Sequence, residues 1–388
     1  CATHTARSMT MLSSCESAPS PIAGRGSLGR LWIPTSDAKI AESEAAMVRE
    51  GYTGDVIVSD VAAGPDGHTI HTIRVPAASK GTLDGRAQTS DSPFVLLHGL
   101  GLGAAAWSPS FNTLAHVGRD VLSIDWPGYG RSSRPTFPMY QGVDTCESFF
   151  VERIEAWRQS LGIRRMVLVG HSFGGYFSAC YAMKYPQHVE RLVLVSPVGM
   201  NEKKTDSPVT QPELRANLPW TRRFFLNTAD ALWSSYWTPG AIVRFLGPFG
   251  RWPVENYVSR RFVRSREAGT KEVDDAVLME YLYHVCAQPG CGEFCLNELL
   301  DFGAWAKRPV GHRLLESFQR LGNAAPPVSF IYGEHDWMDS ATGAQIAKRL
   351  HGQCFIVEGI GHQVVVEGPR AFNATLQRIF CGGDDAKA

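Results

Sequence analysis

Short apolar runs separated by longer amphipathic stretches dominate the chain from residue 52 onward. Two alternating runs, Asp55–Val61 and His68–Val75, flank a Gly-Pro-Asp-Gly turn and predict a pair of half-exposed antiparallel strands. Six further runs are short and mostly apolar, as in buried parallel strands: Pro93–His98, Asp120–Asp125, Met166–Gly170, Arg191–Ser196, Val328–Tyr332 and Cys354–Val357. Helical periodicity separates several of them, at Cys146–Leu161, Phe173–Tyr185 and Ala341–Leu350. The pattern predicts an α/β fold with a mostly parallel central sheet.

The pattern breaks once, between Ser196 and Val328, where about 130 residues show no clear sheet periodicity and are too many for a simple crossover. We therefore predict an α/β core over residues 31–196 and 327–388, with residues 197–326 inserted as a helical cap. The core includes an N-terminal extension with an amphipathic helix at Asp37–Glu50. Residues 1–30, rich in Ser and Thr with three arginines and one acid, predict a disordered leader or a transit-like segment for organelle import.

Composition excludes several classes of protein. The 38 Lys and Arg residues balance 38 Asp and Glu residues, so a nucleic-acid partner is not expected. No apolar run reaches the ~18 residues needed to span a bilayer. The nine cysteines are scattered and odd in number, and the Cys286, Cys291 and Cys295 cluster beside His284 lacks the paired spacing of a zinc site. We expect reduced thiols and no metal.

A nucleophile motif lies at Gly170–Gly174, where GHSFG matches G-x-S-x-G between a predicted strand and a predicted helix. A sharp strand-to-helix turn strains the serine backbone, and a neighbouring Cβ would clash, so glycine is needed on both sides. The start of the helix then presents backbone N–H groups to a developing oxyanion. We predict that Ser172 is the catalytic nucleophile; an ordinary strand–helix turn is the alternative.

A serine nucleophile needs a base and an orienting acid, which in this architecture follow in the order Ser, Asp or Glu, His. The strand ending at Tyr332 is followed by an acid in its loop, and the next strand is followed by a glycine-flanked histidine. We therefore predict Asp336 as the acid and His362 as the base. Asp339, three residues further on, is the alternative acid.

The loop after the third strand should supply the second oxyanion donor. We predict the backbone N–H groups of Phe173 and Leu100 as the oxyanion hole, with Gly99, Gly101 and His171 also contacting substrate. The same loop, Gly99–Ala104, satisfies the dinucleotide-binding pattern G-x-G-x-x-G/A, and Asp125 follows at about the expected spacing. NAD(P) binding is the weaker reading, because two antiparallel strands precede the motif.

Five segments in chain order resemble α/β-hydrolases: HGLGLG from residue 98, DWPGYGRSSRP from 125, GHSFGG from 170, GEHDWMD from 333 and GIGH from 359. Four further segments indicate a more specific resemblance: Gly130–Pro135, Gly247–Gly250, Tyr281–His284 and Trp305–Pro309. These resemble the subfamily of the fourth and fifth abhydrolase-domain proteins, with their plant and fungal relatives. The similarity runs over about residues 31–380, cap included.

The resemblance implies an α/β-hydrolase fold and a serine hydrolase that cleaves acyl esters of glycerophospholipids or lysophospholipids through an acyl-enzyme, without a cofactor. It also implies two alternatives: an acyl-CoA-dependent lysophosphatidate acyltransferase, or a non-catalytic lipase coactivator on lipid droplets. Ser172 favours a working hydrolase. The family's acyltransferase signature places an Asp five residues after the His; here that position is Glu367, the candidate acyltransferase acid. Glu367 also suits the first turn of the final helix.

The cap combines aromatic residues with positive charge. Residues 218–266 hold four of the ten tryptophans and eight arginines, against only two acidic residues. Such a composition is typical of an element that faces anionic headgroups, although a packed lid with solvated arginines is the plain alternative. We predict an intracellular protein peripheral to membranes or lipid droplets, with Arg222 and Arg223 contacting lipid and Trp32 as a second anchor.

Overall fold

The structure is a computed structural model that describes residues 32–78, 92–202 and 212–381. The predicted leader over residues 1–30 lies outside the described residues. In the part of the chain that the structure describes, no helix is long and apolar enough to cross a membrane.

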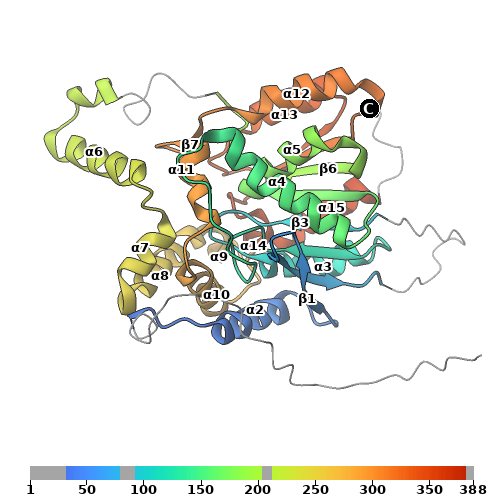
Figure 1. The fold of residues 1–388 in the computed structure, drawn as a ribbon, viewed down its shortest axis with the longest axis horizontal. Coiled ribbons are helices and arrows are strands. Elements are labelled where there is room, and N and C mark those ends of the chain that lie inside the picture. The colour runs from blue at the N-terminus through green and yellow to red at the C-terminus, as the bar shows by residue number, and fades with distance from the viewer. Residues whose placement is uncertain (1–31, 79–91, 203–211, 382–388) are drawn as a thin grey trace, which may run out of the picture.

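Eight strands form the central sheet, in the spatial order β1-β2-β4-β3-β5-β6-β9-β10 (Figure 1). They are β1 Ile57–Ala62, β2 Thr69–Val75, β3 Phe94–Leu97, β4 Val121–Ile124, β5 Met166–His171, β6 Val189–Val195, β9 Val328–Gly333 and β10 Gln353–Val357. Strand β2 pairs antiparallel with β1 and β4, and all other neighbours are parallel. The predicted mostly parallel sheet is confirmed, because each predicted run corresponds to one of these strands.

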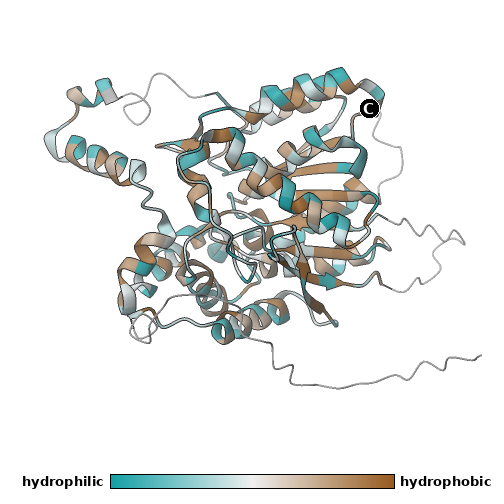
Figure 2. Cartoon of the chain, viewed as in Figure 1, coloured by the Kyte–Doolittle hydropathy of each residue, from teal (hydrophilic) through white to brown (hydrophobic). Residues whose placement is uncertain are grey.

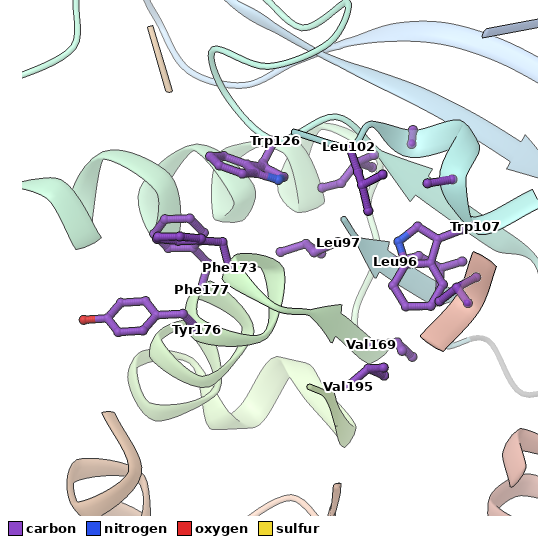
Figure 3. Packing of buried hydrophobic residues seen from close by; sticks show 14 of the residues in the cluster. Leu96, Leu97, Leu102, Trp107, Trp126, Val169, Phe173, Tyr176, Phe177 and Val195 are labelled. Carbon is purple, nitrogen blue, oxygen red and sulfur yellow. The ribbon is translucent and has the colours of Figure 1, made fainter. Parts of the chain in front are cut away.

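The middle of the sheet is apolar because its strands are covered on both faces. Every residue of β3, β4 and β5 is buried, and Figure 2 shows these strands as hydrophobic. In Figure 3, Leu97 of the sheet lies toward Phe173 and Phe177 of the following helix, whereas Val169 lies near Val195. The strand ends that carry the candidate chemistry therefore sit on a rigid support.

Helices flank this sheet in two groups. One group consists of α3 (Ser108–Ala115) and α15 (Pro369–Phe380), which pack on each other. The other is built around α5, with α4 and α12 against it and α13 against α12 (Figure 1). The bounds in this group are α4 Gly142–Ser160, α5 Phe173–Lys184, α12 Val310–Leu321 and α13 Ser340–Arg349. The helices predicted from periodicity correspond to α4, α5 and α13.

Between β6 and β9 the described chain is largely helical. Its elements before α12 are α6 Trp220–Ser234, α7 Pro239–Phe245, α8 Arg251–Arg261, α9 Val263–Glu267, α10 Asp275–Ala287, α11 Cys295–Leu299 and the two-residue strands β7 Leu300–Asp301 and β8 Trp305–Ala306. The predicted cap, residues 197–326, includes α12. In the described part of the chain, α12 packs on α5 and α13 of the core instead of on the other cap helices. Its buried residues, including Leu314 and Phe318, are spaced for that packing.

The N-terminal extension contains α2 (Asp37–Gly51), which contacts α3 of the core and α10 of the cap. Ser36 caps its start by accepting a hydrogen bond from the Lys39 N–H. Glu44 is buried against β2 and accepts hydrogen bonds from His71 (3.0 Å) and Arg131 (2.6 Å). This helix therefore joins the two parts of the molecule.

Candidate active site

The candidate site lies where the parallel strands end. Their carboxyl ends meet along one edge of the sheet, so the loops after β3, β5, β9 and β10 lie side by side. Those four loops carry Leu100, Ser172, Asp336 and His362 in turn. Residues far apart in the sequence are thereby brought to one place, which is the usual ligand position in such sheets.

Ser172 sits at the turn between β5 and α5, with a positive φ of 54°. This backbone is strained for a residue with a Cβ, and the surroundings hold it in place. The Ser172 N–H donates to Val195 O at 2.9 Å. A Cβ on Gly170 would collide with Gly174 O, and one on Gly174 would collide with Leu97 O. The two glycines of the motif are thus required by the close approach of the strand and the helix.

His362 and Asp336 stand in line with the serine. The His362 Nε2 lies 3.1 Å from the Ser172 Oγ, and the His362 Nδ1 lies 2.8 Å from the Asp336 Oδ1. All three side chains are almost fully buried. Burial opposes the negative charge of Asp336, but the hydrogen bond and charge of His362 hold its pKa below the ordinary value. An ionised carboxylate can therefore orient the imidazole and stabilise its protonated form.

Asp339, the alternative acid, has a different place in the structure. It is the N-cap of α13, where its Oδ1 accepts from the Ala341 N–H at 3.0 Å. Its Oδ2 accepts from the Asn201 side chain at 2.9 Å. The geometry therefore favours Asp336 over Asp339 as the partner of His362.

The glycine loop after β3 lies against the serine. A Cβ on Gly99 would lie 2.7 Å from the His171 Nδ1 and 3.0 Å from the Ser172 Cβ. Leu100 and Phe173, whose N–H groups we predict as the oxyanion hole, line one cavity with Ser172. Phe173 is the first residue of α5, so its N–H has no partner within the helix. The loop that resembles a dinucleotide motif thus belongs to the serine site.

Two further residues hold the loop that carries His362. Burial and the neighbouring His362 lower the pKa of His171 to about 3, so its ring is neutral and its Nε2 donates to the His362 carbonyl at 2.9 Å. Glu367, at the end of α14 (Val364–Glu367), accepts from the N–H groups of Gly361 (2.8 Å) and Gln363 (2.9 Å). Gly361 and Gln363 flank His362 in the sequence, so Glu367 acts as a clamp on the loop that carries His362.

We expect Glu367→Asp to lower kcat for ester hydrolysis about 10- to 100-fold, because the shorter side chain cannot span both N–H groups and His362 shifts. KM for an uncharged acyl ester should change little, since Glu367 contacts the loop and not the ester. Glu367→Gln keeps one acceptor oxygen and should lose less. Steady-state kinetics of both variants, with and without acyl-CoA, provide the measurement. Unchanged hydrolysis combined with a gain of acyl transfer in Glu367→Asp would instead assign Glu367 to the acyltransferase signature.

The cavity at Ser172 has a volume of about 340 Å³ and continues beneath the cap. A second chamber of about 350 Å³ shares Leu100, Tyr257 and Gln363 with it. Leucine, isoleucine, valine and proline side chains from α7, α8 and α10 form much of the chamber wall. The space next to the serine can therefore accommodate a long apolar group.

The cap arginines are not arranged as the composition indicates. Arg222 and Arg223 are exposed near the start of α6, which buries no residue and contacts the rest of the molecule through Trp233 near its end (Figure 1). Neither lines the catalytic cavity. Arg261, at the end of α8, lines it instead, with Tyr257 and Gln363. The amino-acid composition does not distinguish Arg261 from Arg222 and Arg223, because it does not show which cap helix covers the site.

Comparison with known proteins gives a consistent result. The family model described as "alpha/beta hydrolase fold" matches residues 92–235. A probable 1-acylglycerol-3-phosphate O-acyltransferase of Oryza sativa subsp. japonica is 32% identical over 367 residues, which cover 91% of this chain and 84% of that protein. A (lyso)-N-acylphosphatidylethanolamine lipase of Mus musculus is 33% identical over 299 residues, covering 75% and 80%. The carboxylesterase CesB of Bacillus subtilis has the same fold, with a TM-score of 0.59 at 18% identity over 89% of this chain and 98% of that one.

Proposed function

The chain belongs to the α/β-hydrolase family, in the branch of the fourth and fifth abhydrolase-domain proteins that its motifs resemble, and from this membership we propose that it cleaves acyl esters of glycerophospholipids or lysophospholipids. The observation that carries the proposal is the serine–histidine–aspartate line, in a cavity that shares wall residues with a neighbouring apolar chamber. Two relatives named for phospholipid chemistry, one a lipase and one an acyltransferase, support the choice of substrate class.

In the proposed mechanism, His362 Nε2 removes the proton of Ser172 Oγ as the oxygen attacks the ester carbonyl. The N–H groups of Phe173 and Leu100 stabilise the resulting oxyanion. The protonated His362, stabilised by Asp336, then protonates the leaving alcohol, and an acyl-enzyme forms on Ser172. A water molecule activated by His362 releases the fatty acid in the same way. No step needs a metal or a cofactor.

Acyl transfer to a lysophospholipid is the second candidate, because the acyl-enzyme can in principle be attacked by an alcohol as well as by water. The signature acid position weighs against it, since Glu367 is engaged with the Gly361 and Gln363 N–H groups and lies beside His362 as a clamp. We therefore place hydrolysis first.

A lipid panel tests the proposal. Diacyl and lysophospholipids with different headgroups, monoacylglycerol and a short soluble ester would be offered with and without acyl-CoA, and fatty-acid release and acyl transfer measured. Faster turnover of long-chain lipids than of the short ester, independent of acyl-CoA, is the expected result. Preference for the short ester would contradict the lipid assignment. An inactive protein that still activates a partner lipase would favour the adaptor alternative.

We further propose that the protein docks on a membrane or lipid-droplet surface through an aromatic patch formed by Trp32, Phe245, Phe249 and Trp252. Phe249 and Trp252 are 75% and 67% exposed, and the other two are exposed as well. Trp32 packs over Gly247, where any Cβ would collide with the indole. An exposed group of large aromatic side chains near cationic residues is typical of a surface that inserts between headgroups.

We expect the double variant Phe249→Ser/Trp252→Ser to bind liposomes about tenfold or more weakly, because each aromatic side chain removes apolar area from water when it inserts. Sedimentation with liposomes of increasing anionic content measures this. Neutralising Arg222 and Arg223 together should remove the part of the binding that depends on salt. Ile356→Ser, which replaces an exposed apolar side chain on β10 of the core, is the matched control. Equal binding by all variants would contradict the docking proposal.

A further inference from the structure

A single arginine faces the reacting centre. Arg261 comes from the last turn of α8 and lines the same cavity as Ser172 and His362. Among the described residues that line this cavity it is the one Lys, Arg, Asp or Glu, since the remainder is apolar apart from Ser172, Tyr257, Gln363 and the two histidines. The Arg261 side chain is 26% exposed, and a partly buried cation attracts a negative group more strongly than a cation in bulk water does, because its surroundings have a lower dielectric constant.

The Arg261 guanidinium has a donor group that is free to bind a ligand. Its Nη2 is buried and, within the part of the chain that the structure describes, has no hydrogen-bond partner. It lies 3.4 Å from the Glu367 Oε1, but that oxygen already accepts the Gln363 N–H at 2.9 Å. A buried donor without a partner costs free energy, so a ligand that supplies oxygen acceptors would recover it.

The surroundings of Arg261 give a ligand a direction. Tyr257 and Gln363 belong to both the catalytic cavity and the apolar chamber, and the Gln363 Nε2 donates to the Tyr257 hydroxyl at 3.1 Å. This pair therefore stands at the junction between the two spaces. An acyl chain can occupy the chamber, which leaves the part of the lipid beyond the ester in the catalytic cavity beside Arg261.

We propose that Arg261 binds the phosphate of the lipid headgroup and thereby makes the site selective for phosphate-bearing acyl lipids over uncharged ones. This inference rests on the proposed function and assigns a specificity residue within it. Arginine suits this task because its planar fork matches two phosphate oxygens at once. The Arg261 Nη2 lies 3.4 Å from the Glu367 Oε1 and makes no hydrogen bond among the described residues, so it can donate to a phosphate oxygen.

Arg261→Gln tests the proposal, with lysophosphatidate and a monoacylglycerol of the same acyl chain compared in neutral detergent micelles. The kcat/KM for lysophosphatidate should fall about 10- to 100-fold, as expected for a lost hydrogen bond to a charged group, while that for monoacylglycerol stays within about twofold. Arg261→Lys should recover only part of the loss. Arg260→Gln, an exposed neighbour on the same helix that does not line the cavity, is the matched control and should leave both values unchanged.

A parallel fall for both lipids would overturn the inference, because Arg261 would then only support the His362 loop through Glu367. A fall of equal size in Arg260→Gln would also overturn it, since general surface charge would account for the effect.

Calorimetry with the inactive Ser172→Ala protein separates this inference from the proposed function. Lysophosphatidate should bind, and the additional change Arg261→Gln should weaken its binding about tenfold or more, whether or not the wild-type protein turns it over. Inorganic phosphate at the same concentration should compete only weakly if the site is built for a lipid headgroup. Competition by inorganic phosphate as strong as by lysophosphatidate would overturn the lipid assignment in favour of a free-phosphate site.

Discussion

Replacing Ser172 by alanine should lower acyl-ester turnover about 10,000- to 1,000,000-fold, because the acyl-enzyme can no longer form. The fold should survive, because within the described part of the chain the Ser172 Oγ hydrogen-bonds only His362. The backbone N–H of residue 172, which holds the turn by donating to Val195 O, is retained in the variant. The residual rate would come from the oxyanion hole and from substrate binding. Turnover of the lipid that the panel identifies as the best substrate is the measurement, with circular dichroism to check the fold.

Ser178→Ala is the matched control for this experiment. Ser178 is a buried serine of α5, the helix that follows Ser172, and its hydroxyl has no hydrogen-bond partner among the described residues. Alanine should therefore be tolerated there. A fluorophosphonate probe should label the wild type and Ser178→Ala, and should fail to label Ser172→Ala. Undiminished labelling of Ser172→Ala would mean that another residue is the nucleophile.

Asp336→Asn should lower kcat about 10,000-fold, the second large effect. An amide at this position can present its NH₂ to His362 Nδ1, which favours the tautomer that cannot accept the serine proton. It also removes the charge that stabilises the protonated imidazole. Because the hydrogen bond and charge of His362 lower the pKa of Asp336, the Asp336 charge in the wild type should persist to a pH below the ordinary range of a carboxyl group.

Asp339→Asn is the matched control, because it changes the alternative acid in the same way. Asparagine is as good an N-cap as aspartate, so α13 should remain stable and the turnover close to that of the wild type. The opposite result, with Asp339→Asn inactive and Asp336→Asn active, would move the acid to Asp339. Crystallographic or NMR evidence of an altered His362 tautomer in Asp336→Asn would link the loss to its cause.

The fold and the three central residues could be predicted from the sequence because they depend on local spacing and on chain order. Alternating and apolar runs identify strands, and strands that are parallel place their following loops at one edge. The sharp turn at Ser172 needs glycines at positions 170 and 174, and the sequence has them. The sequence does not separate Asp336 from Asp339, since both follow β9. The structure shows Asp336 beside His362 and Asp339 at the start of a helix.

The cap could not be resolved from its composition. Eight arginines near four tryptophans indicate a surface for lipid, but the direction in which each helix points depends on packing between segments distant in sequence. Composition therefore predicts Arg222 and Arg223 as lipid contacts and does not distinguish Arg261 from the other cap arginines. The sequence likewise offers Glu367 as an acyltransferase acid, because hydrogen bonds to two backbone N–H groups leave no signature in a single sequence.

The helix α2 constrains how a lipid can enter. It lies before the sheet in the chain, yet it packs on α10 of the cap as well as on α3 of the core. Thr35, just ahead of it, hydrogen-bonds His284 of α10 at 2.9 Å. A cap held at a third point cannot swing open as one rigid flap about its two connections to the sheet. We therefore expect a lipid to enter through local movement of α7 and α8, the helices that carry Phe245 and Trp252. If these aromatic side chains insert into a membrane as proposed, contact with the membrane and opening of the site would be a single motion.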